Sequence, residues 1–221
     1  MKFTLTYDGE LPSTGNGGGV VKRQQKWDIR KHFAPQLEEL WRVHPALKQT
    51  LHNRRVPRAG PFLLQDVHHE DEAAQGARIA RSRVGTADLR DLCEPISKGG
   101  RQFFPLVRSS LALGCGLKVL FLRREGVGRV YQGGDIDGRV KTLLDALSVP
   151  VDQNHVFPDP TLGDAPIYCL LEDDSLISGL NIETERLLSA PNAAESVVKL
   201  VIEVDVRVTD SRAYNHSFLG N

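Results

Sequence analysis

The chain has 221 residues, of which 40% are hydrophobic and 25% charged, and its 28 basic residues balance its 28 acidic ones. This composition is typical of a folded globular protein and excludes a disordered, collagen-like or disulfide-dense class. No uncharged run approaches the ~18 residues of a membrane span, and the first residues lack the apolar core of a signal peptide. We therefore expect a cytoplasmic protein without membrane contacts. Its three cysteines are far apart with no CxxC spacing, which favours buried, reduced thiols; they are Cys93, Cys115 and Cys169.

The balanced total conceals a segregation of charge along the chain. Residues 22–58 hold ten basic and three acidic residues, and residues 78–129 hold eleven basic and four acidic ones. In contrast, residues 135–185 hold eleven acidic residues and only two basic ones. Basic surface beside clustered carboxylates suits a polyanionic partner handled through metal ions. The alternative is that the two kinds of segment are solvated and neutralise each other.

The first half of the chain begins with a strand and a basic helix. Apolar and polar residues alternate over residues 3–7, which predicts a half-buried strand. A loop rich in Gly, Pro and Ser follows over residues 9–19. From Lys22, apolar residues recur at helical spacing to Trp41, and we expect this helix to break near Pro35. We interpret residues 44–110, which show weak periodicity, as a probable insertion into the domain.

The second half predicts further strands around a second helix. Strands are expected at residues 117–122, 167–171 and 176–182, and the almost perfect alternation over 198–208 indicates a strand with one wet side. Apolar residues at i, i+3, i+4 and i+7 predict a helix over 138–147. The prolines within residues 148–170 indicate an enlarged loop. Strands and helices mixed in this order predict an α/β (α+β) fold, with the whole chain, residues 1–221, forming one domain.

The start of the second helix carries the most informative polar residues. Asp135 and Asp137 stand two residues apart just before the helix. Asp137, Lys141 and Asp145 then fall along one edge of the helix, away from its apolar stripe. Taken alone, an aspartate–lysine–aspartate ladder at this spacing is often only a stabilising feature of a helix.

Three consecutive acids, Glu172, Asp173 and Asp174, lie between two expected strands. Carboxylates at this density repel one another unless a cation lies among them, and hard oxygen ligands are those that Mg²⁺ or Mn²⁺ selects. A bound metal of this kind lowers the pKa of a water and stabilises a phosphoryl transition state. An acidic pair before a strand is also common in turns, so it is the combination of the two acidic segments that points to chemistry.

In this combination the sequence resembles the RusA-type Holliday junction resolvases. That family has an Asp-x-Asp-Asn-x-x-x-Lys-x-x-x-Asp-x-Leu signature followed by an Asp-Asp pair that leads into a strand. Here Asp135, Asp137, Lys141 and Asp145 match the first part at the family's spacing, and the pair Asp173–Asp174 matches the second. Gly138 departs from the pattern because the family has an asparagine at this position.

The resemblance implies a RusA-like mixed sheet of four to five strands with two or more packed helices. It also implies a homodimeric, Mg²⁺-dependent endonuclease, a hydrolase that cuts four-way DNA junctions in DNA recombination and repair. The implied catalytic residues are Asp135, Asp137, Lys141 and Asp174, and the implied metal ligands are Asp135, Asp137, Asp173 and Asp174.

Basic residues at the start of the first helix are expected to contact DNA phosphates without reading sequence. They are Lys22, Arg23, Lys26 and Arg30. Their alternative interpretation is the solvated face of an amphipathic helix. Two alternative functions also stay open: a RusA-like protein that binds nucleic acid or regulates without cleaving, and a nuclease for another branched or single-stranded substrate.

Overall fold

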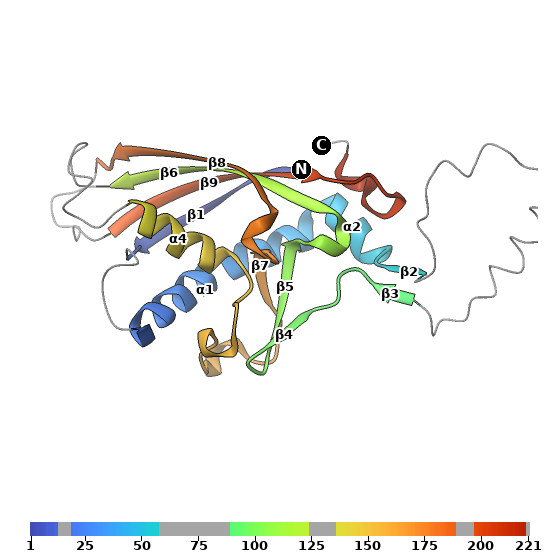
Figure 1. The fold of residues 1–221 in the computed structure, drawn as a ribbon, viewed down its shortest axis with the longest axis horizontal. Helices are drawn as coiled ribbons and strands as arrows, with labels where there is room; N and C mark the ends of the chain where they lie inside the picture. Colours follow the sequence, from blue (N-terminus) through green and yellow to red (C-terminus); the bar gives the residue numbers. More distant parts are fainter. Residues whose placement is uncertain (13–18, 58–88, 124–135, 189–196, 220–221) are drawn as a thin grey trace, which may run out of the picture.

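A four-stranded mixed sheet forms the centre of the molecule, with strand order β1–β9–β6–β8 (Figure 1). The computed structural model describes residues 1–12, 19–57, 89–123, 136–188 and 197–219. β9 runs antiparallel to both β1 and β6, whereas β6 and β8 are parallel. The strands span β1 (Lys2–Glu10), β6 (Leu113–Arg123), β8 (Ile177–Arg186) and β9 (Val197–Val208).

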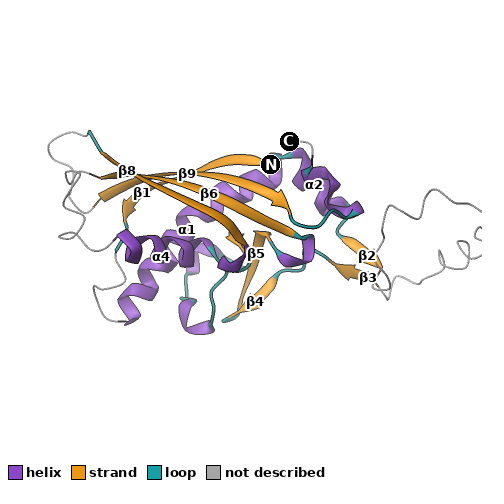
Figure 2. Cartoon of the chain, turned by 45° about the horizontal axis from the view of Figure 1, so that its top comes forward, coloured by secondary structure: helices purple, strands orange, loops and turns teal. Residues whose placement is uncertain are grey.

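Helices cover one face of this sheet. α1 (Gly19–Val43) and α4 (Ile136–Leu147) lie beneath the strands, and α2 (Pro45–His52) follows α1 directly (Figure 2). The alternation of β9 explains this layering, because every second side chain is buried against the helices while Lys199 and Glu203 stay exposed. The buried set is Val198, Leu200, Ile202, Val204 and Val206.

A smaller sheet, of order β4–β5–β7, lies below the main sheet (Figure 1). Its strands are β4 (Ile96–Lys98), β5 (Arg101–Val107) and β7 (Ile167–Leu171), and β2 (Arg55–Pro57) pairs separately with β3 (Leu89–Asp91). β5 and β7 are parallel, and they continue through short turns into β6 and β8, which are also parallel. The turns are η3 (Ser109–Leu111) and η6 (Asp174–Leu176). The loop before β7 contains η4 (Gln153–His155) and η5 (Pro160–Leu162).

The mixed α/β class predicted from the sequence is confirmed, but two local expectations are wrong. α1 does not break at Pro35, because the helix continues to Val43 with Leu37 and Trp41 buried in the core. The expected insertion at residues 44–110 includes β5, whose residues from Phe103 to Val107 are all buried. Residues 58–88 of that expected insertion lie outside the described residues.

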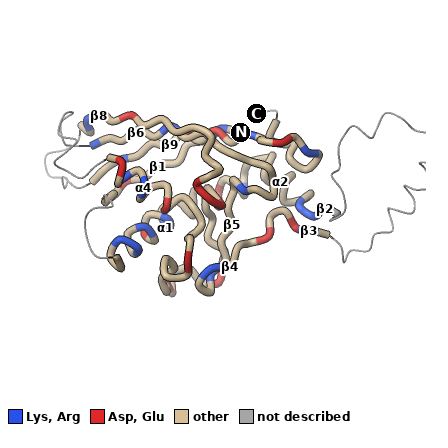
Figure 3. The backbone as a smooth tube through the Cα atoms, in the orientation of Figure 1, with Lys and Arg blue, Asp and Glu red and all other residues tan. Residues whose placement is uncertain are grey.

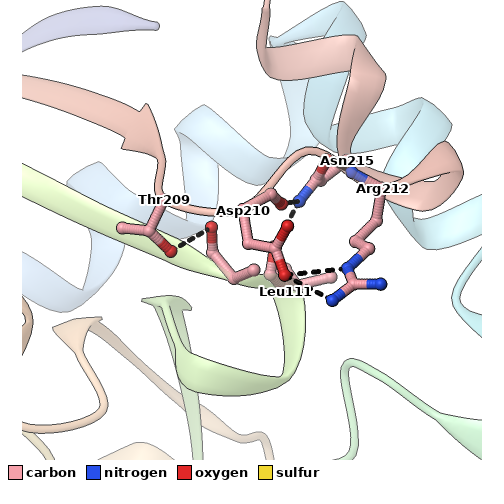
Figure 4. A network of polar contacts seen from close by, with 6 residues as sticks. Leu111, Thr209, Asp210, Arg212 and Asn215 are labelled. Carbon is pink, nitrogen blue, oxygen red and sulfur yellow. Dashed lines mark hydrogen bonds and ion pairs between the residues drawn. The ribbon is translucent and has the colours of Figure 1, made fainter. Parts of the chain in front are cut away.

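A polar network fastens the C-terminal turn η7 (Ala213–Phe218) to the end of the sheet (Figure 4). The side chain of Asn215 is fully buried and donates hydrogen bonds to the carbonyl oxygens of Leu111 (3.0 Å) and Asp210 (2.9 Å). Its own amide oxygen accepts a bond from the backbone N–H of Arg212 (2.9 Å). Because a buried amide needs such partners, the network fixes one position for η7.

The three cysteines are buried free thiols, as the sequence predicted. Burial raises the pKa of each thiol to about 11. Within the part of the chain that the structure describes, no helix is long and apolar enough to cross a membrane.

Candidate functional site

The N-terminal turn of α4 presents two of the predicted catalytic side chains. Asp137 lies in the first turn and is exposed, a position where the helix dipole favours a negative charge. Lys141 is exposed one turn later, while the intervening residues Gly138 to Val140 are buried. Asp135, predicted both as a catalytic residue and as a metal ligand, lies outside the described residues. The exposed edge predicted for this helix is therefore present over its first two turns.

Farther along the same edge, Asp145 forms an ion pair with Lys26 of α1. Both side chains are partly buried, with exposed fractions of 31% and 20%. An ion pair in such a position is screened less by water than one on the open surface. Lys26, which the sequence analysis assigned to DNA, therefore has an acidic partner within its own chain.

Arg30, the fourth residue assigned to DNA, is buried and holds the C-terminal end of α4. Only 3% of it is exposed. Its guanidinium donates to the carbonyl oxygen of Ser148 at 3.1 and 3.0 Å and to that of Asp145 at 2.6 Å. Carbonyls at a helix end have no partner within the helix, and a cation there also complements the helix dipole. Burial lowers the pKa of Arg30, but nearby negative and polar groups oppose this effect.

The expectation that Arg30 contacts DNA is thus corrected to an internal role, because α4 packs over this part of α1. Lys22 and Arg23 lie one turn or more before Lys26, at the beginning of α1, and both are half-buried. They stay within the predicted phosphate-binding set. Figure 3 shows basic segments of α1 beside the mixed charges of α4.

Other basic residues fasten the loop over residues 148–170. Lys31 forms ion pairs with Asp159 (2.8 Å) and Asp28 (3.1 Å), and the bond from Asp159 is the main reason why the pKa of Lys31 is raised. Arg101 at the start of β5 donates to the backbone oxygens of Asp159 (2.7 Å) and Gly163. These contacts join basic segments of the first half to the acidic segment of the second. Part of the charge segregation in the sequence is therefore neutralised inside the molecule.

The acidic group after β7 is partly occupied with local structure. Asp173 caps η6 by accepting a hydrogen bond from the backbone N–H of Ser175 (2.9 Å), and this bond lowers the pKa of its carboxyl. Glu172 accepts from the backbone N–H of Ser109 (2.7 Å). Asp174 is exposed at the first position of η6.

The structure does not bring Asp137 together with Asp173 and Asp174. The backbone N–H of Val149, just after α4, donates to the carbonyl oxygen of Leu171 (2.9 Å), so it is the C-terminal end of α4 that adjoins the end of β7. Asp137 lies about 16 Å back along the helix axis, at 1.5 Å per residue. Across the described residues, no group of three or more His, Cys, Asp or Glu side chains is placed to hold a metal ion. The described carboxylates alone therefore do not fit a three-ligand metal centre.

Sequence reasoning missed the internal roles of Arg30, Lys31 and Arg101. Their signal was the opposite charge of the two halves of the chain, but charge alone does not say which residues meet. Comparisons with protein-family models, with curated proteins and with solved structures find no match to this chain.

Proposed function

We propose that the chain is a Mg²⁺-dependent endonuclease that hydrolyses phosphodiesters in branched DNA, with four-way junctions as its substrate in recombination and repair. The observation that carries the proposal is the exposure of Asp137 and Lys141 on the first turns of α4, at the spacing of the RusA-type signature. The exposed Asp174, in the Asp-Asp pair that leads into β8, supports it further.

The proposed metal ligands are Asp135, Asp137 and Asp174, with Asp173 beside them, and the proposed ion is Mg²⁺ or Mn²⁺. Because the described acids are not gathered into one group, the proposal requires Asp135 as a ligand and a closer approach of the two acidic segments when metal and DNA bind. Lys141 would stabilise the negative charge of the scissile phosphate, and Lys22 and Arg23 would contact neighbouring phosphates. A homodimer would place two such sites about a two-fold axis and allow paired cuts.

A specific observation favours a second candidate, a protein that binds branched DNA without cutting it. The separation of Asp137 from Asp173 and Asp174 removes a ready metal centre, whereas the basic residues at the start of α1 do not depend on it. Such a protein would bind DNA with a steep dependence on salt and with no need for Mg²⁺.

The test is cleavage of a synthetic four-way junction in Mg²⁺, beside a linear duplex of the same sequence. The native protein is compared with Asp137→Asn and with the control Asp164→Asn, which changes an exposed acid of the 148–170 loop. Binding is measured separately in Ca²⁺, and the heat of Mn²⁺ binding is measured by titration calorimetry.

Paired nicks that are lost in Asp137→Asn but kept in the control, with binding intact, would support the nuclease. Binding without nicks in any of the three proteins would favour the second candidate. Absence of both nicks and binding would overturn the two of them.

A further inference from the structure

The two edges of the main sheet are finished in different ways. At β1, the side chain of Gln36 from α1 binds the outer edge of the strand: its amide oxygen accepts from the N–H of Thr6 (3.0 Å) and its NH₂ donates to the oxygen of Thr6 (2.8 Å). A side-chain amide used in this way takes the place of a neighbouring strand. An edge blocked like this is a poor template for another chain.

At β8, the other edge, the backbone is bonded on one side only. Its partner is β6, and no described backbone group bonds to its outer side. The pairing with β6 shifts near Ser178 and then runs without interruption from Gly179 to Arg186. The strand contains neither the proline nor the lysine that often protects an edge. A long, straight edge of this kind favours the addition of another strand.

We infer that β8 is the interface through which two copies of this chain associate, with β8 of each copy pairing antiparallel about a two-fold axis at Asn181. The two four-stranded sheets would then form one continuous sheet. The axis stands perpendicular to the sheet, so the helix-covered faces of both copies lie on the same side. Such an interface is isologous, with the same residues contributed by each copy.

Apolar side chains on the helix-covered side favour this register. Leu180 and Ile182 pair in register with the buried residues Leu117 and Val119, so they point to the same side of the sheet. Nevertheless Leu180 is 42% exposed, because no strand lies beyond it among the described residues. With the axis at Asn181, Leu180 lies directly opposite Ile182 of the partner subunit, and the pair occurs twice. Cross-strand apolar pairs of this kind are the main stabilising unit of a sheet.

Charge on the opposite side favours the same register. An axis at Glu183 would place this residue opposite its own copy, and an axis one residue later would place it opposite Glu185, and like charges directly opposite are destabilising. With the axis at Asn181, Glu183 lies opposite Gly179 of the partner subunit. A Cβ added at Gly179 would meet nothing within 4 Å, so there is room for the incoming side chain.

That room is part of a hollow of about 620 Å³ on the open face of the sheet, where Gly116 and Gly179 are neighbours in register. Three basic side chains line it together with two acidic ones; the basic ones are Lys2, Lys118 and Arg207. A carboxylate arriving from the second copy would therefore meet basic side chains at its rim. The inference rests on the edge and the face of the sheet and not on nuclease activity.

The first measurement is the mass of the protein in solution, by sedimentation equilibrium over a range of concentrations. We expect twice the chain mass of 24.5 kDa for the native protein and the single mass for Leu180→Lys. The matched control is Val151→Lys, which places the same charge on a residue that is 79% exposed and distant from β8 in the chain. A native protein that is monomeric at ~100 µM, about a hundredfold above a micromolar Kd, would overturn the inference. A dimer unaffected by Leu180→Lys would overturn it as well.

The second measurement reads the register and does not depend on how well Leu180→Lys folds. Directly opposite side chains of an antiparallel pair have Cβ atoms about 5 Å apart, so Asn181→Cys should form a disulfide between two copies on mild oxidation. Glu183→Cys should not, because its copy lies four residues along the strand, about 13 Å away. The native cysteines are buried and do not compete. Cross-linking at 183 but not at 181, or at neither position, would refute the proposed pairing, whatever the outcome of the cleavage assay.

Discussion

Replacing Arg30 by methionine tests the most specific contact between the two helices. Methionine keeps much of the apolar length of the side chain but removes the guanidinium, which leaves the carbonyls of Asp145 and Ser148 at the end of α4 without their donor. A buried acceptor without a partner costs about 1–3 kcal/mol, and two acceptors are affected. The variant also escapes the cost of burying a charge, which offsets part of this loss.

We therefore expect Arg30→Met to lower the free energy of unfolding by about 2–4 kcal/mol. In a chain of this size each kcal/mol corresponds to about 2–4 °C in Tm, so a loss of about 3 kcal/mol gives about 6–12 °C. Urea unfolding followed by tryptophan fluorescence measures it, because Trp27 and Trp41 are 1% and 3% exposed. Arg30→Lys should recover only part of the loss, since one ammonium does not reproduce the fork of the guanidinium.

The matched control is Arg42→Met, because the side chain of Arg42 is 72% exposed and pairs only with Glu39 on the same helix. Its effect should stay within about 0.5 kcal/mol. If Arg30→Met were as stable as this control, the guanidinium would not hold the end of α4, and its proposed role would be wrong.

Three further predictions concern charge, capping and the thiols. A double-mutant cycle on Lys26→Ala and Asp145→Asn should give a coupling energy of about 0.5–1 kcal/mol that shrinks in high salt, and no coupling would refute the ion pair. Asp173→Ala should lower stability in urea unfolding by about 1 kcal/mol because the cap on Ser175 is lost, whereas Asp173→Asn should retain most of it, and equal losses would contradict the cap. The thiols should react with a disulfide reagent at pH 8 many-fold more slowly in the native than in the unfolded protein. Since burial raises their pKa from 9.0 to about 11, the unfolded state loses these protons first, and stability should fall as the pH rises through this interval.

Periodic segments were predictable from the sequence because their pattern records burial on one side. The alternation over residues 198–208 and the apolar spacing over 138–147 each correspond to an element of the structure, β9 and α4. β5 was missed for the opposite reason. It is buried from Phe103 to Val107 and pairs on both sides, so its side chains do not alternate, and Pro105 interrupts the pattern of a strand.

The sequence alone determined the mixed α/β class, the buried thiols and the spacing of Asp137 and Lys141 along one edge of a helix. Only the tertiary structure decided that α1 runs through Pro35, because burial of Leu37 and Trp41 outweighs the hydrogen bond that a proline removes. It also decided where the basic charge goes. Charge in a sequence has a sign but no direction, and the packing of α1 against α4 turns Arg30 inward to the carbonyls of α4.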